Sequence, residues 1–386
     1  MRILYFTRDY TTHDRRFLLA LRNRGLEVHY LRLEDDGEHY EARLLPTGVQ
    51  QVAWRGGAGR VTTLEGCLGL MPDLMRVIEG VHPDLVHAGP LQSCGFMAAL
   101  ANRHPLVIMS WGSDVLVEAD RSPLSQWLTG YVLAQAQLFA CDCAAVAKKA
   151  QGYVPLPDGR IIIFPWGLER KQPAAQTRGE GLALRRSLGW EGHRVVLSMR
   201  AWEPIYGVDV VLEAFRQASA EDASLRLLLL GSGSMHEGFR RFIECHGLGA
   251  RIHSPGLVAH EETAAYFGAA DVYVSAAHSD GTSISLLEAM AYGLPPVVTD
   301  IASNREWVEE GFNGWLVTDG DAEELAARML DPTDDTITEV MAARNRVIIA
   351  ERADWERNID RLVVAYSALK GSSKGARLDL SESFRG

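Results

Sequence analysis

The alternation of short apolar runs with longer amphipathic segments is the feature that most constrains the fold of this chain. Apolar runs occur at residues 3–6 and Leu106–Met109, and again at Val195–Met199 and Val272–Ser275, with segments of helical period such as 208–218 between them. Strands that are apolar throughout are typical of parallel sheets covered by helices on both faces. The sequence therefore predicts an α/β protein built from doubly wound, Rossmann-like sheets.

This alternation runs through the chain twice, which predicts two domains. The first series ends near residue 167, the polar and small residues 170–180 are interpreted as a linker, and the second series begins at Val195. A length of 386 residues fits two domains of ordinary size. We place an N-terminal domain at 1–172 and a C-terminal domain at 173–353, and we expect ligands to bind in a cleft between them.

The composition excludes several classes of function. The net charge of -11 argues against general binding of nucleic acid, which needs a basic surface. The five cysteines are scattered without metal-ligand spacing, so we expect free thiols, a cytoplasmic protein and no metal site. A strand begins at the N-terminus, so we expect no signal peptide, and no apolar run approaches the roughly 20 residues of a membrane-spanning helix. The small polar residues 371–386 predict a disordered tail.

Four arginines near the N-terminus leave a contact with a membrane surface open. Arg15, Arg16, Arg22 and Arg24 lie on one predicted helix. A solvated helix face is the interpretation we favour, and peripheral contact with the inner face of a membrane is the alternative.

The strongest chemical signal lies in the second half, where a strand runs through a loop into a helix. Residues 271–275 lead to Asp280 and a tight turn, and the following helix carries Glu288. Such a turn presents backbone N–H groups at the positive end of the helix dipole, which suits phosphate. The carboxylate of Glu288 could accept hydrogen bonds from two vicinal hydroxyls, as on a ribose. The turn residues are Gly281, Thr282, Ser283 and Ile284.

An ordinary strand, loop and helix with solvated carboxylates is the alternative interpretation of this stretch. Glu288, however, is flanked by Leu286, Leu287, Ala289 and Met290. A carboxylate in apolar surroundings is expected to have a partner, which favours a ligand site.

The same stretch resembles the donor-site signature of the family 4 glycosyltransferases, retaining enzymes with the GT-B fold. Their signature is Glu-x7-Glu followed by Gly-Leu-Pro-Val-Val; here Asp280 and Glu288 stand at the acidic positions, and Gly293 precedes Leu-Pro-Pro-Val-Val. The resemblance extends over about residues 1–370 and implies two Rossmann-like domains facing a central cleft, with a helix at about 354–370 returning to the first. It implies that Glu288 holds the ribose, while Asp280 and the turn backbone hold the donor sugar and diphosphate.

Three further segments resemble the nucleotide-binding loops of this family. Arg200 follows a strand and resembles the arginine that binds the diphosphate; the usual lysine is absent, and Ile205 and Tyr206 stand in its neighbourhood. Gly231 resembles the glycine of a loop that passes close to the nucleotide. Val258 lies in a segment whose backbone contacts the base in the family. A surface arginine at a strand end is the alternative for Arg200.

Candidate contacts with the acceptor or the transferred sugar lie at the strand ends of the first domain. Thr12 and His13 follow the first strand, where the family often carries glycines. Trp111 stands where many relatives have a histidine and could stack on a sugar ring. Asp114 is the candidate for a polar contact with the sugar or the acceptor hydroxyl, and His87 ends another strand at the same rim.

Two of these loops have a structural alternative. Asp14, next to His13, could cap the helix that begins there. Asp114 could likewise cap the helix that follows it. Both interpretations remain open from the sequence.

These features predict transfer of a sugar from a nucleoside diphosphate sugar to an acceptor hydroxyl, with retention; a UDP-sugar is favoured and GDP-mannose is next. Arg200 and the turn amides would stabilise the departing diphosphate, with Asp114, Asp280 and Glu288 as further catalytic residues. The resemblance implies that the departing phosphate takes the acceptor proton, so we expect no metal, cofactor or protein nucleophile. The acceptor would be a glycan, a lipid-linked sugar or a small molecule in polysaccharide, lipopolysaccharide or other glycoconjugate synthesis.

Other functions are compatible with parts of this pattern. The missing lysine and histidine would also fit a nucleotide-sugar-binding protein with little or no activity. A GT-B epimerase or phosphorylase is a second alternative, although no lysine is placed for a pyridoxal cofactor. A dinucleotide-dependent dehydrogenase is disfavoured because no Gly-x-Gly-x-x-Gly follows the first strand.

Overall fold

The computed structural model describes residues 1–35, 43–57, 59–61, 63–102, 105–169, 174–331 and 335–371. These residues form two compact units, one comprising Met1–Pro165 with the C-terminal segment from Glu356, and the other Trp166–Trp355. We predicted the change of domain between residues 172 and 173, whereas the second unit begins at Trp166. The predicted tail lies, from residue 372 onward, outside the described residues.

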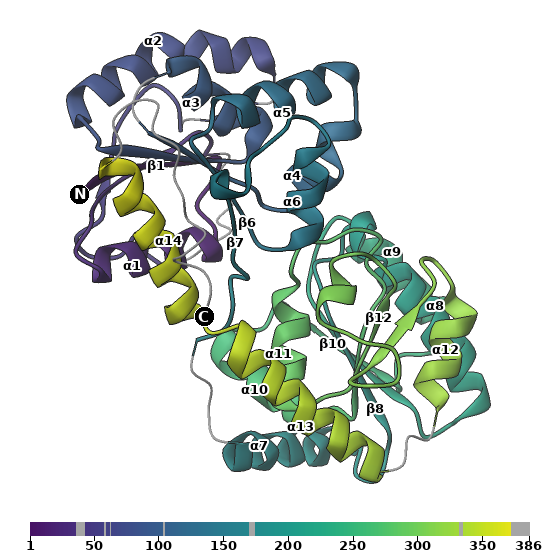
Figure 1. The fold of residues 1–386 in the computed structure, drawn as a ribbon. Helices are drawn as coiled ribbons and strands as arrows, with labels where there is room; N and C mark the ends of the chain where they lie inside the picture. The colour runs from purple at the N-terminus through teal and green to yellow at the C-terminus, as the bar shows by residue number, and fades with distance from the viewer. Residues whose placement is uncertain are drawn as a thin grey trace. The chain divides into compact units, whose positions relative to one another are not determined.

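Unit 1 is built on a parallel sheet with the strand order β3-β2-β1-β4-β5-β6-β7. Helices cover both faces, and helix α14 from the C-terminal end of the chain lies beside α1 (Figure 1). The strands are β1 Arg2–Thr7, β2 Glu27–Arg32, β3 Gln50–Gln51, β4 Leu85–Gly89, β5 Leu106–Met109, β6 Leu138–Cys141 and β7 Ile161–Ile163. The helices are α1 Thr12–Asn23, α2 Leu64–Val81, α3 Phe96–Ala101, α4 Ser113–Leu116, α5 Pro123–Gln135, α6 Ala144–Gln151 and α14 Trp355–Gly371.

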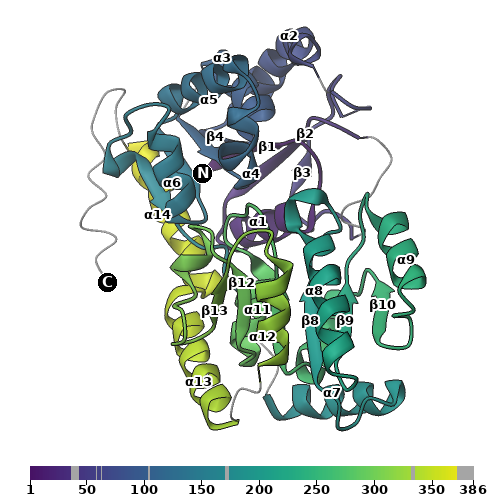
Figure 2. The same cartoon turned by 90° about the vertical axis from the view of Figure 1, so that its right-hand side faces the viewer.

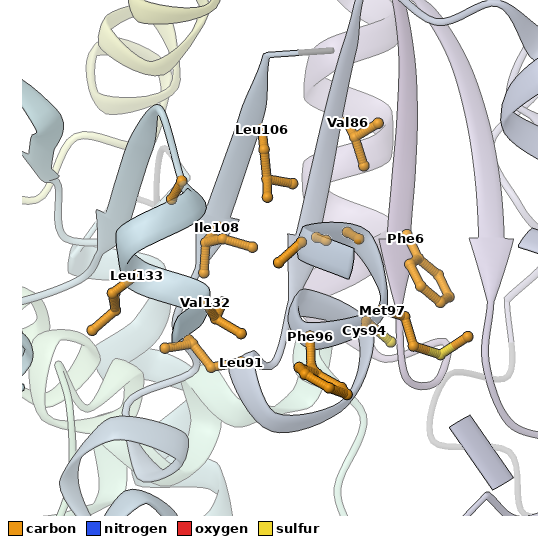
Figure 3. Close-up of a cluster of buried hydrophobic side chains, with 14 of the residues drawn as sticks. Phe6, Val86, Leu91, Cys94, Phe96, Met97, Leu106, Ile108, Val132 and Leu133 are labelled. Atoms are coloured by element: carbon orange, nitrogen blue, oxygen red, sulfur yellow. The ribbon is translucent and has the colours of Figure 1, made fainter. Parts of the chain in front are cut away.

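Apolar side chains of β1, β4 and β5 build the main core of unit 1 against α3 and α5 (Figure 3). Phe6, Val86 and Ile108 point from the sheet toward Met97 and Val132 of these helices. All five side chains are almost completely buried. Their burial on one face of continuous apolar strands is what the sequence pattern predicts.

Unit 2 is built on a parallel sheet with the order β10-β9-β8-β11-β12-β13. Helices α8 and α12 lie side by side over one face (Figure 2), and α7, α10, α11 and α13 cover the other. The strands are β8 Val195–Met199, β9 Arg226–Leu230, β10 Ile252–Gly256, β11 Val272–Ser275, β12 Pro296–Thr299 and β13 Trp315–Val317. The helices are α7 Ala174–Leu188, α8 Val208–Glu221, α9 His236–Cys245, α10 Thr263–Ala269, α11 Ile284–Tyr292, α12 Ala322–Leu330 and α13 Asp335–Arg352.

The stretch predicted as a linker, residues 170–180, is corrected by the structure. Residues 170–173 lie outside the described residues, and helix α7 begins at Ala174. Gly181 of α7 faces Gly268 of α10 so closely that a Cβ atom on Gly181 would lie 2.0 Å from the carbonyl carbon of Gly268. Gly181, directly after that stretch, and Gly268 therefore allow a close crossing of two helices. The predicted doubly wound α/β fold is confirmed in both units.

Candidate functional site

Two loops of unit 2 carry the predicted diphosphate residues, and both leave the sheet at the carboxyl ends of neighbouring strands. Arg200 directly follows β8, and Asp280 lies between β11 and α11. The strand order runs outward from this pair, because β9 lies beyond β8 and β12 lies beyond β11. This arrangement is the topological switch point at which doubly wound sheets bind ligands.

The guanidinium group of Arg200 is held by neighbours from both loops. Its Nη2 donates to Oδ2 of Asp280 at 2.6 Å, and its Nη1 donates to Oγ of Ser283. The ring centre of Tyr206 lies 4.2 Å from the guanidinium carbon. Burial raises the pKa of Asp280, and the adjacent Arg200 charge offsets part of that effect. The cation and the shortened acidic residue of the signature therefore contact each other.

Ser283 joins this cluster to the start of α11. Its side chain caps the helix by accepting a hydrogen bond from the backbone N–H of Leu286 at 3.4 Å. Ser285, in the first turn of α11, shares a hydrogen bond of 2.8 Å with the hydroxyl of Tyr273. Thr282 and Ser283 are buried, and Ile284 packs against the core under α11. Arg200 thus lies beside the N-terminus of a helix, where positive charge is concentrated.

Glu288 is buried within α11, although it carries a carboxylate. Its residue exposure is 4%, and the adjacent residues Leu287 and Ala289 belong to the apolar core. Nδ1 of His260 lies 3.9 Å from its Oε1 atom. Gly293, with a φ of 83°, ends the helix in the left-handed region. The local sequence therefore fixes Glu288 on a short helix between a cap and a glycine.

In the structure, the packing of two neighbouring loops requires a glycine at position 231. A Cβ atom there would lie 1.9 Å from the carbonyl oxygen of Arg200, and the φ angle is 134°. The glycine therefore lets the loop after β9 pass directly against the loop after β8. Val258 follows β10, is half-buried and packs against the same core as Ile284.

Tyr206 is a functional candidate that the sequence did not single out. In the sequence it stands near the place of the missing lysine. Gly207 follows it with a φ of 57°, and the turn it closes brings the Tyr206 ring over Arg200. The glycine after Tyr206 signals a turn in the sequence, but only the fold shows that the Tyr206 ring packs on Arg200, six positions earlier.

In unit 1, Asp114 lies in the first turn of α4, whose N-cap residue is Gly112, and its carboxylate binds the backbone around it. Its Oδ1 accepts hydrogen bonds from the Ser110 hydroxyl at 2.6 Å and from the backbone N–H groups of Trp111 and Val115, each at 3.1 Å. Its Oδ2 accepts from the backbone N–H of Leu91 at 3.2 Å. Burial raises the pKa of Asp114 to about 6. These bonds tie two loops together at the end of β5.

The predicted position of His87 at the rim is wrong. His87 lies inside β4 with no exposed surface, stacked on Tyr5 with ring centres 4.8 Å apart. Its Nδ1 shares a hydrogen bond with the hydroxyl of Tyr366 in α14. Burial lowers the pKa of His87 to about 3. The strand continues past this residue to Gly89, so the histidine belongs to the interior and not to the strand end.

The loop after β1 is organised by capping. Thr11 and Asp14 form a capping box, in which the Thr11 N–H donates to Oδ2 of Asp14 at 2.8 Å. Thr12 is exposed, and the ring centre of His13 lies 6.2 Å from that of Trp111. Burial, followed by the charge of Arg16, lowers the pKa of His13 to about 4. The structure thus brings His13 and Trp111 together and gives Asp14 a structural task.

Two further properties concern metal ions and membranes. Within the described part of the chain, no three His, Cys, Asp or Glu side chains gather as a metal site requires. Among the helices of the described residues, none combines the length and the apolar character needed to cross a bilayer.

Comparison with known families covers both units. Residues 182–347 match the family Glycosyl transferases group 1, and residues 2–143 match Glycosyl transferase 4-like. The first match includes Arg200, Asp280 and Glu288, and the second includes His13 and Trp111. The chain belongs to the group 1 glycosyltransferases.

Relatives of this group 1 glycosyltransferase act in different settings. The D-inositol 3-phosphate glycosyltransferase of Geodermatophilus obscurus is 30% identical over 61% of this chain and 54% of its own length. The amylovoran biosynthesis glycosyltransferase AmsK of Erwinia amylovora is 30% identical over 39% of this chain and 40% of its own length. The chain thus spans about half or less of the length of these curated relatives.

The fold of this group 1 glycosyltransferase is shared with solved GT-B structures. HepE of Anabaena in complex with UDP has a TM-score of 0.76 and 19% identity, covering 95% of this chain and all of the other. HepE has also been solved with UDP-glucose, with a TM-score of 0.75 and 20% identity over 95% of this chain and 99% of the other. At this identity the likeness shows the fold, and the predicted GT-B class is confirmed.

Proposed function

We propose that this protein transfers a sugar from a nucleoside diphosphate sugar to an acceptor hydroxyl, with retention at the anomeric carbon. The observation that carries the proposal is the placement of Arg200 beside the N-terminus of α11, at the switch point between β8 and β11. The Arg200 cation and the positive end of the α11 dipole lie side by side at this point. Such concentrated positive charge stabilises a leaving diphosphate.

The proposed roles of the residues combine the family resemblance with their positions in the structure. Arg200 and the backbone at residues 281–284 bind the diphosphate, Asp280 contacts the donor sugar and Glu288 binds the ribose. In unit 1, Trp111 and His13 form a wall of the acceptor site, and Asp114 positions the loop that carries Trp111. Because fixed positive charge stabilises the leaving group, we propose that transfer proceeds without a metal or another cofactor.

UDP-sugars are the proposed donors, with GDP-mannose next. The complexes of HepE with UDP and with UDP-glucose, on the same fold, support this order. The proposed acceptor is a glycan, a lipid-linked sugar or a small molecule, and the relatives include enzymes named for D-inositol 3-phosphate and for amylovoran biosynthesis. We place the protein in the cytoplasm, with peripheral contact at the inner membrane face where the acceptor is lipid-linked.

A nucleotide-sugar-binding protein without transferase activity is the second candidate. The pairing of Arg200 with Asp280 favours it, because a carboxylate of the protein already neutralises the cation. The two candidates share the donor site and differ in turnover. Transfer of labelled sugar from a donor panel to water or acceptors separates them.

The donor site itself is tested by thermal unfolding with UDP-, GDP- and ADP-sugars. We expect one nucleotide class to raise the unfolding temperature of the wild type, since a ligand at about 100 times its Kd adds about 2.7 kcal/mol of stability. Glu288→Ala should abolish that rise by removing the ribose contact. Glu213→Gln, in an exposed pair with Arg216 on α8, is the control and should keep the rise. An unchanged rise in Glu288→Ala would exclude the ribose role.

A further inference from the structure

The donor-site cation already has a counter-ion in this protein. The Arg200 side chain is only 9% exposed, and the 2.6 Å bond to Asp280 is its contact with a carboxylate. Its Nε–H group is buried and has no hydrogen-bond partner among the described residues. A buried donor without a partner is costly, so the protein does not satisfy every hydrogen-bond donor of Arg200.

The position of the guanidinium group does not depend on Asp280 alone. The Tyr206 ring packs against one face, and the Ser283 hydroxyl accepts from Nη1. The Ser285 hydroxyl lies 3.5 Å from the same Nη1 and is itself held by Tyr273 at 2.8 Å. Arg200 can therefore stay in place while its charge partner changes from a carboxylate to a phosphate.

When a phosphate replaces Asp280 as the partner of Arg200, the surroundings of the Asp280 carboxylate depend on which ligand is bound. A nucleoside diphosphate at Arg200 places more negative charge beside a carboxylate that has lost its cation, and neighbouring like charges repel. A sugar attached to the diphosphate offers hydroxyl donors to the same carboxylate. The nucleoside diphosphate left after transfer has lost the hydroxyls of that sugar.

We propose that Asp280 is an internal counter-ion of Arg200 and opposes the binding of a nucleoside diphosphate. An intact nucleotide sugar offsets this opposition, because its sugar hydroxyls donate hydrogen bonds to the Asp280 carboxylate. The proposal rests on the proposed function of this site. It makes Asp280 a determinant of discrimination between donor and product, so that the spent nucleotide leaves more readily than the donor.

The test compares binding of UDP and UDP-glucose by calorimetry in the wild type and in Asp280→Asn. We expect the substitution to tighten UDP binding by about tenfold, because it removes the competing charge next to Arg200. UDP-glucose should gain less, since the wild-type carboxylate already has hydroxyl partners. The ratio of the Kd for UDP to the Kd for UDP-glucose should therefore fall. Unchanged or weaker UDP binding in Asp280→Asn would overturn the proposal.

Two controls separate this proposal from the proposed function. Glu213→Gln removes the same charge from the exposed Arg216 pair and should leave both affinities unchanged. Pyrophosphate, titrated into the same variants and into Asp280→Ala, reports on Arg200 without any base. If UDP fails to bind the wild type, the proposal of UDP-sugar donors is wrong. Tighter pyrophosphate binding in the Asp280 variants would still support the role of Asp280 as a counter-ion. If pyrophosphate binds these variants no more tightly than the wild type, the counter-ion is refuted.

Discussion

Tyr206 illustrates how a single residue can change the way a cation is held. Its ring contacts the Arg200 guanidinium at 4.2 Å, which fits a cation–π contact worth roughly 0.5–2 kcal/mol at a partly desolvated site. We therefore expect Tyr206→Leu to weaken UDP binding by roughly three- to tenfold and Tyr206→Phe to retain it. Calorimetric titration of both variants measures this directly.

The control for Tyr206 is a similar contact elsewhere in unit 2. Phe312 packs on Arg344 with the guanidinium carbon 3.9 Å from the ring centre. Phe312→Leu should leave UDP binding unchanged. If Tyr206→Phe were as weak as Tyr206→Leu, the hydroxyl and not the ring would be responsible.

His87 makes the stability of unit 1 sensitive to acid. Burial lowers its pKa in the folded protein to about 3, whereas the unfolded chain takes up a proton below its ordinary pKa of about 6.5. The unfolded state thus binds more protons between these values, and the free energy of unfolding falls as the pH decreases through this window. From pH 7 to pH 5, this one group should cost about 2 kcal/mol.

The variant His87→Gln isolates this effect, because glutamine is neutral and can still bond to the Tyr366 hydroxyl. Denaturant unfolding at pH 7 and pH 5 measures how far the free energy of unfolding falls between these values. This fall should be about 2 kcal/mol smaller in the variant than in the wild type. The same comparison on His246→Gln, an exposed histidine of unit 2, should show no such difference. An equal acid-induced loss in wild type and His87→Gln would contradict the assignment.

At the scale of elements, helix α13 is fixed to the end of α11 by two buried asparagines. Nδ2 of Asn345 donates to the carbonyl oxygen of Asn313 at 2.9 Å and to that of Leu294 at 3.4 Å, and its Oδ1 accepts from Nδ2 of Asn313 at 2.9 Å. Leu294 directly follows Gly293, which ends the helix that carries Glu288. The network therefore holds the C-terminal end of the donor-site helix.

We expect Asn345→Ala to lower the free energy of unfolding by about 2 kcal/mol or more, because it leaves buried polar groups without partners. Val347→Ala, at a position of the same helix that is 55% exposed, should change it by less than about 1 kcal/mol. Chemical denaturation of both variants provides the comparison. A loss in Asn345→Ala no larger than in Val347→Ala would show that the network is dispensable.

At the scale of the whole molecule, the first unit is completed by the end of the chain. Helix α14 buries Ile359, Leu362 and Tyr366 in unit 1. Arg24 of α1, which we interpreted as part of a solvated face, instead contacts Asp360 at 2.5 Å and Glu356 at 2.9 Å. Unit 1 therefore depends on residues more than three hundred positions apart.

A charge placed on the buried face of α14 should test this dependence. Ile359→Asp should destabilise unit 1 by about 4 kcal/mol or more, because a carboxylate is forced into an apolar site. Val364→Asp, at a half-exposed position of the same helix, should be tolerated. Limited proteolysis followed by mass spectrometry should find early cleavage within residues 1–165 in Ile359→Asp, but not in Val364→Asp or the wild type. Early cleavage confined to unit 2 would contradict this role of α14.

The fold class was within reach of the sequence because burial on both faces of a parallel sheet leaves continuous apolar strands. The strands at residues 3–6 and Val195–Met199 and the helix at Ala322–Leu330 follow directly from that pattern. The edge strand β3 has two residues, both exposed, and gives no such signal. The small residues before Leu188 were ambiguous, because a flexible linker and a close helix crossing favour the same residue types.

The sequence by itself determined the two α/β sheets, the family and the identity of Arg200, Asp280 and Glu288 as the residues of interest. Only the tertiary structure decided their partners: Arg200 bonds to Asp280 and lies under Tyr206, and His87 is buried against Tyr366. The physical reason is that periodicity reports which faces are buried, which is a local property. Which charges meet depends on loops brought together by strand order, and that order is settled by packing over the whole sheet.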